Sequence, residues 1–125
     1  GVVEEALLSL KARQPLYLAG AFGGAAALVI DLLEGRERTE FTSEYQRAAP
    51  FTDEMRALYD RLGLAWESYE EMTAYFRSVG TAGLAASNRL SVEENRELFW
   101  CRNVARIVEL LLEGLTRGSS GRVDI

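Results

Sequence analysis

The residues with the clearest capacity for chemistry form a glycine-rich stretch at residues 15–24, PLYLAGAFGG. The apolar run 16–19 ends at this glycine cluster, and a second apolar segment, residues 25–30, follows at once. This order predicts a buried parallel strand, a tight turn and a helix that begins at the turn. Unpaired amides and the helix dipole favour an anion at such a helix start, and glycine lets a ligand approach the main chain. We therefore expect the turn to bind the phosphate of a nucleotide-like ligand.

The expected ligand contacts are the backbone amides of the turn, with an aromatic ring beside the base or sugar. The residues are Gly20, Ala21, Phe22, Gly23, Gly24 and Ala25, with Phe22 as the aromatic neighbour. The alternative is that these glycines only allow a strand and a helix to pack closely. Arg89 lies in the small-residue segment 80–90, which could bring its guanidinium toward a phosphate, although a solvated surface position also explains it.

Composition restricts the classes of function. The chain has 125 residues, a net charge of −5, one cysteine and no histidine. The acidic balance argues against a surface that binds duplex nucleic acid. A single Cys101 excludes an internal disulfide, and no zinc-ligand spacing is present, so we expect no metal site and a cytoplasmic location. No apolar run is long enough for a membrane span. Because no base is available to activate it, we interpret Cys101 as a small buried hydrophobe.

Helical patterns occupy most of the remaining chain. Helices are expected before Pro15 and over residues 25–33, 52–62, 68–79, 91–97 and 103–118, with a short edge strand at 98–100. Segments 41–49 and 80–90 are expected to be irregular, and residues 36–40 to form a solvated turn. Several residues are expected to act locally, as helix caps or turn residues: Gly35, Ser68, Ser91 with Glu94 in a capping box, Asn88 and Asn95. The helix over 52–62 should turn Met55, Leu58, Tyr59 and Leu62 toward the core. The last helix should bury Ile107, Val108, Leu111 and Leu115.

The elements predicted from the sequence are one clear strand and many helices. This combination indicates an α/β fold that the chain does not complete. A lone parallel strand cannot pair its own backbone groups, so one or two parallel strands would need neighbours from outside this segment. The chain also starts at Gly1, without an initiator methionine. We interpret it as part of a longer protein.

Two blocks of sequence resemble a known family. Residues 1–7 (GVVEEAL) followed by 15–25 (PLYLAGAFGGA), together with 88–99 (NRLSVEENRELF), are similar to the SLOG superfamily, in the bacterial branch related to the cytoplasmic region of TRPM channels. The resemblance implies a Rossmann-like three-layer fold, with residues 1–118 as the C-terminal part of one nucleotide-binding domain and 119–125 as a flexible tail. A missing N-terminal half or a second chain would complete the sheet, and a homo-oligomer is expected.

The resemblance also implies a ligand. SLOG domains bind nucleotides or nucleotide-derived sugars, such as ADP-ribose, at the glycine turn. One residue of the acidic pair Glu4–Glu5, with Glu5 as the candidate, would bond a ribose hydroxyl, although a solvated helix start also explains the pair. The hydrolase branch carries catalytic glutamates where this chain has Ala26 and Ala27. We therefore assign no catalytic residue and expect a non-enzymatic sensor with no certain cofactor. The alternatives are an enzyme that cleaves N-glycosidic bonds and an assembly segment that binds no ligand.

Overall fold

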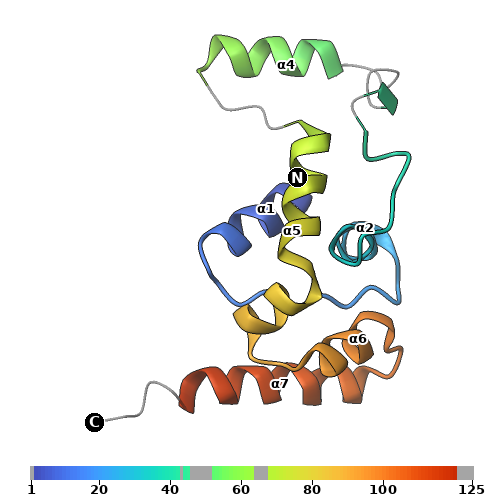
Figure 1. Cartoon of the computed structure of the whole chain (residues 1–125), viewed down its shortest axis with the longest axis vertical. Helices are drawn as coiled ribbons and strands as arrows, with labels where there is room; N and C mark the ends of the chain where they lie inside the picture. The colour runs from blue at the N-terminus through green and yellow to red at the C-terminus, as the bar shows by residue number, and fades with distance from the viewer. Residues whose placement is uncertain (1, 43, 46–51, 64–67, 121–125) are drawn as a thin grey trace.

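The computed structural model describes residues 2–42, 44–45, 52–63 and 68–120, and within these ranges the chain is helical. The described helices are α1 (Val2–Lys11), α2 (Gly24–Leu33), α4 (Thr52–Arg61), α5 (Tyr69–Asn88), α6 (Val92–Trp100) and α7 (Val104–Ser120). Figure 1 shows α5 at the centre, with α1 and α2 beside it, α4 at one end of the molecule and α6 and α7 at the other. The prediction of an α/β fold with a Rossmann-like sheet is wrong, because no strand occurs among the described residues.

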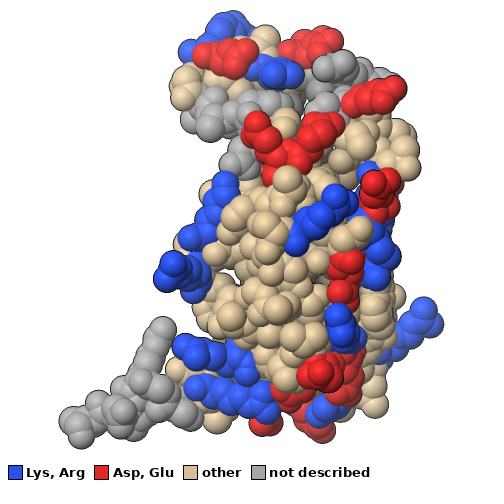
Figure 2. Space-filling view, viewed as in Figure 1, with Lys and Arg blue, Asp and Glu red and all other residues tan. Residues whose placement is uncertain are grey.

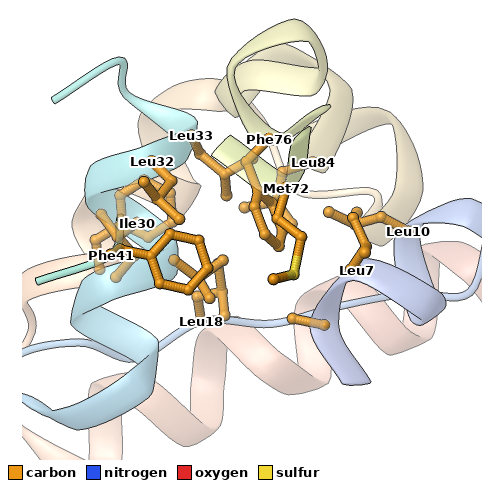
Figure 3. Close-up of a cluster of buried hydrophobic side chains, with 13 residues drawn as sticks. Leu7, Leu10, Leu18, Ile30, Leu32, Leu33, Phe41, Met72, Phe76 and Leu84 are labelled. Carbon is orange, nitrogen blue, oxygen red and sulfur yellow. The ribbon is translucent and has the colours of Figure 1, made fainter. Parts of the chain in front are cut away.

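Two hydrophobic clusters hold these helices together. The larger cluster joins α1, α2 and α5, and Figure 3 shows Leu7, Ile30 and Phe76 from these three helices converging on it. Phe41 adds its ring from the loop after α2, in an edge-on contact with Tyr69 at 4.9 Å between ring centroids. The smaller cluster, centred on the buried residues Leu90, Leu98 and Leu110, joins α6 to α7.

The predicted strand at residues 16–19 is an extended segment that lies between the two clusters. Leu16 and Leu18 pack against the larger cluster, whereas Tyr17 and Ala19 pack against the smaller one. Successive side chains of an extended segment point to opposite sides, so both sides of this segment are covered by apolar groups. The apolar run correctly indicated an extended segment buried on two sides. It could not show that helices, rather than neighbouring strands, provide the cover.

Backbone groups of this segment bond to helices instead of a sheet. The Asn88 side-chain amide donates to the Leu16 carbonyl at 2.8 Å, and the Gly20 amide donates to the Phe99 carbonyl at 2.7 Å. These contacts replace the strand neighbours that the sequence led us to expect. Completion of the domain by another half or by a second chain stays a prediction.

Three helix ends follow local capping signals. Ser68 accepts a hydrogen bond from the Glu71 amide at the start of α5, and Ser91 with Glu94 forms the predicted capping box of α6. Gly35 has a φ of 80° just beyond α2, as its C-cap signal predicted.

One predicted helix end is right and one is wrong. The first part of α5 ends at Gly80, as predicted, because φ 62° and ψ 178° are not helical, but a second helical part follows at once to Asn88 in place of the expected irregular segment. Helix α6 continues through residues 98–100, where an edge strand was expected. Segments 81–88 and 98–100 show that local composition is only a weak guide to where a helix forms.

The predicted inner faces of two helices are also partly wrong. On α4, Met55 and Leu58 are exposed. On α7, Leu110 is buried, whereas Val108 and Leu115 are exposed. Much of the predicted irregular segment 41–49 and most of the predicted tail lie outside the described residues. No helix in the described part of the chain has the length and apolarity required to cross a membrane.

Candidate functional site

The glycine turn has two consecutive residues in backbone conformations that favour glycine. The Gly23 amide donates to the Gly20 carbonyl at 3.0 Å, which closes the turn. Gly23 then has a φ of 82° and Gly24 a φ of 71°, conformations that residues with a side chain rarely adopt. Gly23 is the N-cap of α2 and Gly24 is its first residue, so glycine is required here by the backbone and not only by packing.

The start of α2 carries no side-chain cap. Gly23 occupies the N-cap position without a side-chain hydrogen bond, and the first turn contains no acidic residue. The first amides of a helix have no partner within the helix, and the dipole adds partial positive charge at this end. A Cβ placed at Gly23 or Gly24 would meet no atom of the described structure within 4 Å. Phe22, beside them, is 72% exposed. The turn therefore presents amides, open space and an aromatic ring to solvent.

Gly20 has a different role from the other two glycines. A Cβ at this position would lie 2.4 Å from Cδ1 of Ile30, 3.2 Å from the Phe99 carbonyl and 3.3 Å from Cα of Ala27. Gly20 is therefore a packing residue that lets the turn lie against α2 and the end of α6. Close packing therefore explains Gly20, whereas it does not explain Gly23 and Gly24, where a Cβ would meet no described atom within 4 Å.

The contacts that Glu5 and Arg89 make among the described residues do not include this turn. Glu5 is exposed on α1, and its side chain makes no hydrogen bond or ion pair with the described residues. Arg89 is the C-cap of α5 and has a left-handed backbone conformation. Its side chain lies near Gly118 of α7, where an added Cβ would be 3.9 Å from Arg89 Cγ. Ala21 and Ala25 lie in the turn and in the first turn of α2, as expected.

The acidic residue nearest in sequence to the turn, Asp31, is occupied elsewhere. Arg36 donates to its carboxylate at 2.8 Å, and Arg38 donates to its other oxygen. Partial burial raises the pKa of Asp31, but these hydrogen bonds outweigh burial, so the pKa lies below its ordinary value. An ionised, doubly paired carboxylate at the far end of α2 is unsuited to acid–base catalysis at the turn.

Sequence reasoning missed a hollow of about 450 Å³ between the loop after α2 and the first half of α5. Its volume is in the range of small-molecule sites. Its lining carries charges of both signs, three threonines and one ring, from Glu37, Arg38, Thr39, Phe41, Thr42, Glu70, Thr73, Ala74 and Arg77. Figure 2 shows this mixture of signs more widely, with blue and red residues side by side along one edge of the molecule. Since the loop was expected to be a solvated turn, nothing in its pattern indicated a hollow.

No cluster of three or more potential metal ligands occurs among the described residues.

A search of curated proteins and a search of solved structures each found no match. The family described as SLOG cluster2 matches residues 1–98, which is most of the chain and includes the glycine turn. The chain therefore belongs to the SLOG family, as the two sequence blocks indicated.

Proposed function

We propose that this chain is a non-enzymatic module that binds an anionic, nucleotide-derived ligand, of the ADP-ribose type, at the glycine turn. The observation that carries the proposal is the uncapped start of α2, where Gly23 and Gly24 have positive φ and face open space. Membership of the SLOG family supports a nucleotide-related ligand. A reducing cytoplasm, compatible with the single cysteine, is the proposed place of action.

Binding energy would come from backbone amides rather than from a side-chain cluster. A phosphate at the start of α2 would accept hydrogen bonds from the first amides of the helix and gain from its dipole. The exposed ring of Phe22 would offer a stacking surface to a base or to the face of a sugar. The absence of acidic residues from the first turn of α2 removes a source of repulsion for the phosphate.

The same turn supports binding better than hydrolysis. Cleavage of an N-glycosidic bond needs a carboxylate close to the reacting carbon. Ala26 and Ala27 occupy the positions where the hydrolase branch carries glutamates, and Asp31 is paired with two arginines. Incubation with NAD and nucleoside monophosphates should therefore release no free base, and sustained release would contradict the proposal.

A thermal-shift titration with ADP-ribose, AMP and inorganic phosphate tests the site. A ligand that binds only the folded chain raises the melting temperature with concentration. Gly23→Val should abolish this rise, because its side chain would occupy the space above the amides and strain the backbone.

Gly35→Val is the matched control for backbone strain. Gly35 has a φ of 80°, close to the 82° of Gly23, and a Cβ there also meets nothing within 4 Å. Both variants should lose stability, but only Gly23→Val should lose the ligand response. Equal ligand responses in the two variants, or no response of the unmodified chain to any of the three compounds, would overturn the proposed site.

A further inference from the structure

The hollow beside α5 has two walls that run in opposite directions along the chain. A Cβ at Gly80, where α5 bends, would lie 3.9 Å from the Leu33 carbonyl oxygen at the end of α2. At the other end of this wall, the ring centroid of Phe41 lies 4.9 Å from that of Tyr69, the first residue of α5. The loop between Leu33 and Phe41 therefore runs back along α5, from its bend to its first turn, and the hollow lies between the two.

The α5 wall is one face of the helix. Thr73, Ala74 and Arg77 line the hollow at positions i, i+1 and i+4, with the small Ala74 beneath the guanidinium-bearing side chain. Thr73 is half-buried, and its hydroxyl makes no hydrogen bond to the described residues. This wall therefore offers a short apolar surface, a hydroxyl group and a cation.

The loop wall is fixed by Arg38. Its Nε donates to Glu40 at 2.6 Å, and its Nη1 donates to the carboxylate of Asp31 on α2. Phe41, further along the loop, is 7% exposed and packs in the larger hydrophobic cluster. The charge of Arg38 is already balanced by two carboxylates, so this residue shapes the wall and does not need a ligand to neutralise it.

Two opposite charges line the hollow without neutralising each other. Glu37 lies on the loop wall and Arg77 on the α5 wall, and neither makes an ion pair or a hydrogen bond with the described residues. The other two charged lining residues, Arg38 and Glu70, have partners of their own. A simple anion in the hollow would be repelled by Glu37 and a simple cation by Arg77. A molecule that carries both charges would pair with both residues at once.

We propose that this hollow is a second ligand site, which binds a free α-amino acid with an apolar side chain. The carboxylate of the amino acid would accept hydrogen bonds from the Arg77 guanidinium, whose planar fork matches a carboxylate. Its ammonium group would donate to Glu37. Its side chain would lie on Ala74 and Phe41, and the volume of about 450 Å³ has room for a molecule of this size.

This site is separate from the glycine turn. The turn precedes α2 and the loop wall follows it, and a helix of ten residues is about 15 Å long. The amino acid and the proposed nucleotide-derived ligand would therefore bind at opposite ends of α2. Failure of one proposal leaves the other unaffected.

A titration with leucine and with phenylalanine, followed through the amide NMR signals of the chain, tests the site. Signals of residues 36–42 and 70–77 should shift as the amino acid is added, whereas those of Gly23 and Gly24 should not. Absence of any shift with both amino acids, or shifts confined to other residues, would overturn the proposal.

Two derivatives of leucine test the need for both charges. Leucinamide lacks the carboxylate, and N-acetyl-leucine lacks the ammonium group. Each should bind at least about tenfold more weakly than leucine, because each loses a hydrogen bond between charged groups. Equal binding of leucine and either derivative would overturn the assignment of the hollow to an amino acid.

Three variants assign the binding to the two walls. Arg77→Gln and Glu37→Gln each remove one charge, and each should weaken leucine binding at least about tenfold. Ala74→Leu should abolish binding, because its side chain would fill the hollow. Ala74 is exposed and leucine is a good helix former, so the fold should be kept, as the amide spectrum of the variant would verify.

Arg56→Gln is the matched control for Arg77→Gln. Arg56 is an exposed arginine within another helix, α4, and makes no ion pair with the described residues. This variant should bind leucine like the unmodified chain. Unchanged binding in Arg77→Gln, or an equal loss in Arg56→Gln, would overturn the proposal.

Discussion

Asn88 and Asn95 exchange hydrogen bonds through their side-chain amides in the interior of the protein. Asn88 Nδ2 donates to Asn95 Oδ1 at 2.7 Å, Asn95 Nδ2 donates to Asn88 Oδ1 at 3.2 Å, and both residues are 0% exposed. The same amides also reach the backbone, where they contact the carbonyls of Leu16 and Ser91 and the amide of Leu90. The pair thus joins the extended segment to the turn between α5 and α6.

Asn88→Ala should destabilise the protein by about 3 kcal/mol or more, because it leaves buried groups of Leu16, Leu90 and Asn95 without partners, each at a cost of about 1–3 kcal/mol. Urea unfolding measures the loss. Asn103→Ala is the control, since Asn103 is an exposed residue that caps α7 through the Arg106 amide. Loss of such a cap costs about 1 kcal/mol. A smaller loss for Asn88→Ala than for Asn103→Ala would contradict the structural role of the pair.

The predicted and observed folds differ where an element depends on distant residues. Ser68, Ser91 and Gly35 gave correct helix ends because capping is decided within a few residues. The extended segment was correctly located but wrongly paired, because a strand needs a neighbour that no local pattern reveals. Asn88 was interpreted as a local turn residue, since nothing in its neighbourhood shows that it contacts Leu16, 72 residues away.

The residues of the candidate site, like the helix ends, could be predicted only where their conformation is decided locally. The special conformations of Gly23 and Gly24 could be predicted from glycine chemistry at a helix start. The positions of Glu5 and Arg89 could not, because each depends on how a different helix packs. The Asp31 ion pairs also form through a loop, residues 36–40, whose course the sequence does not specify.

Gly114→Ala should destabilise the protein although alanine is the better helix former. A Cβ at Gly114 would lie 2.7 Å from both Cε1 and the hydroxyl oxygen of Tyr17 and 2.8 Å from the Asn88 carbonyl oxygen. The helix-propensity gain is about 1 kcal/mol, and overpacking of a fixed site costs about 1–3 kcal/mol or more. Tyr17 is held by its own hydrogen bond to that carbonyl, at 3.1 Å, so it cannot easily move aside. Thermal unfolding should show a lower melting temperature.

Gly118→Ala, on the same helix, measures the gain in helix propensity at a position where the added Cβ is not crowded. A Cβ there has only Arg89 Cγ near it, at 3.9 Å, which is ordinary contact. This variant should be as stable as the unmodified chain or slightly more stable. If both alanine variants gain stability, α7 does not pack against Tyr17 as the structure shows.

Stability should fall at low pH partly through Glu94. Hydrogen bonds from Arg117, and then from the Ser91 backbone amide, lower the pKa of Glu94 from 4.5 to about 2. The pKa of this carboxyl is lower in the folded chain, so its contribution is fully present above about pH 4.5 and is lost as the pH falls toward 2. In Arg117→Met the urea midpoint should therefore fall less steeply over this interval.

Arg77→Met is the control for this experiment, because Arg77 is exposed and makes no ion pair with the described residues. Its pH profile should match that of the unmodified chain. Identical profiles for Arg117→Met and Arg77→Met would show that the Glu94 contact does not contribute to the acid sensitivity.

Thr81→Val should stabilise the protein. Thr81 follows the bend of α5 at Gly80, is 5% exposed, and its hydroxyl has no hydrogen-bond partner among the described residues. A buried hydroxyl without a partner costs about 1–3 kcal/mol, whereas valine has nearly the same shape and the same branched Cβ, so packing and helix propensity change little. Urea unfolding should show a gain of about 1 kcal/mol.

Thr73→Val, at a less buried position on the same helix, should change stability little. A loss of stability in Thr81→Val alone would mean that the hydroxyl has a partner, such as a bound water at the bend, and that α5 needs this polar contact to bend at Gly80.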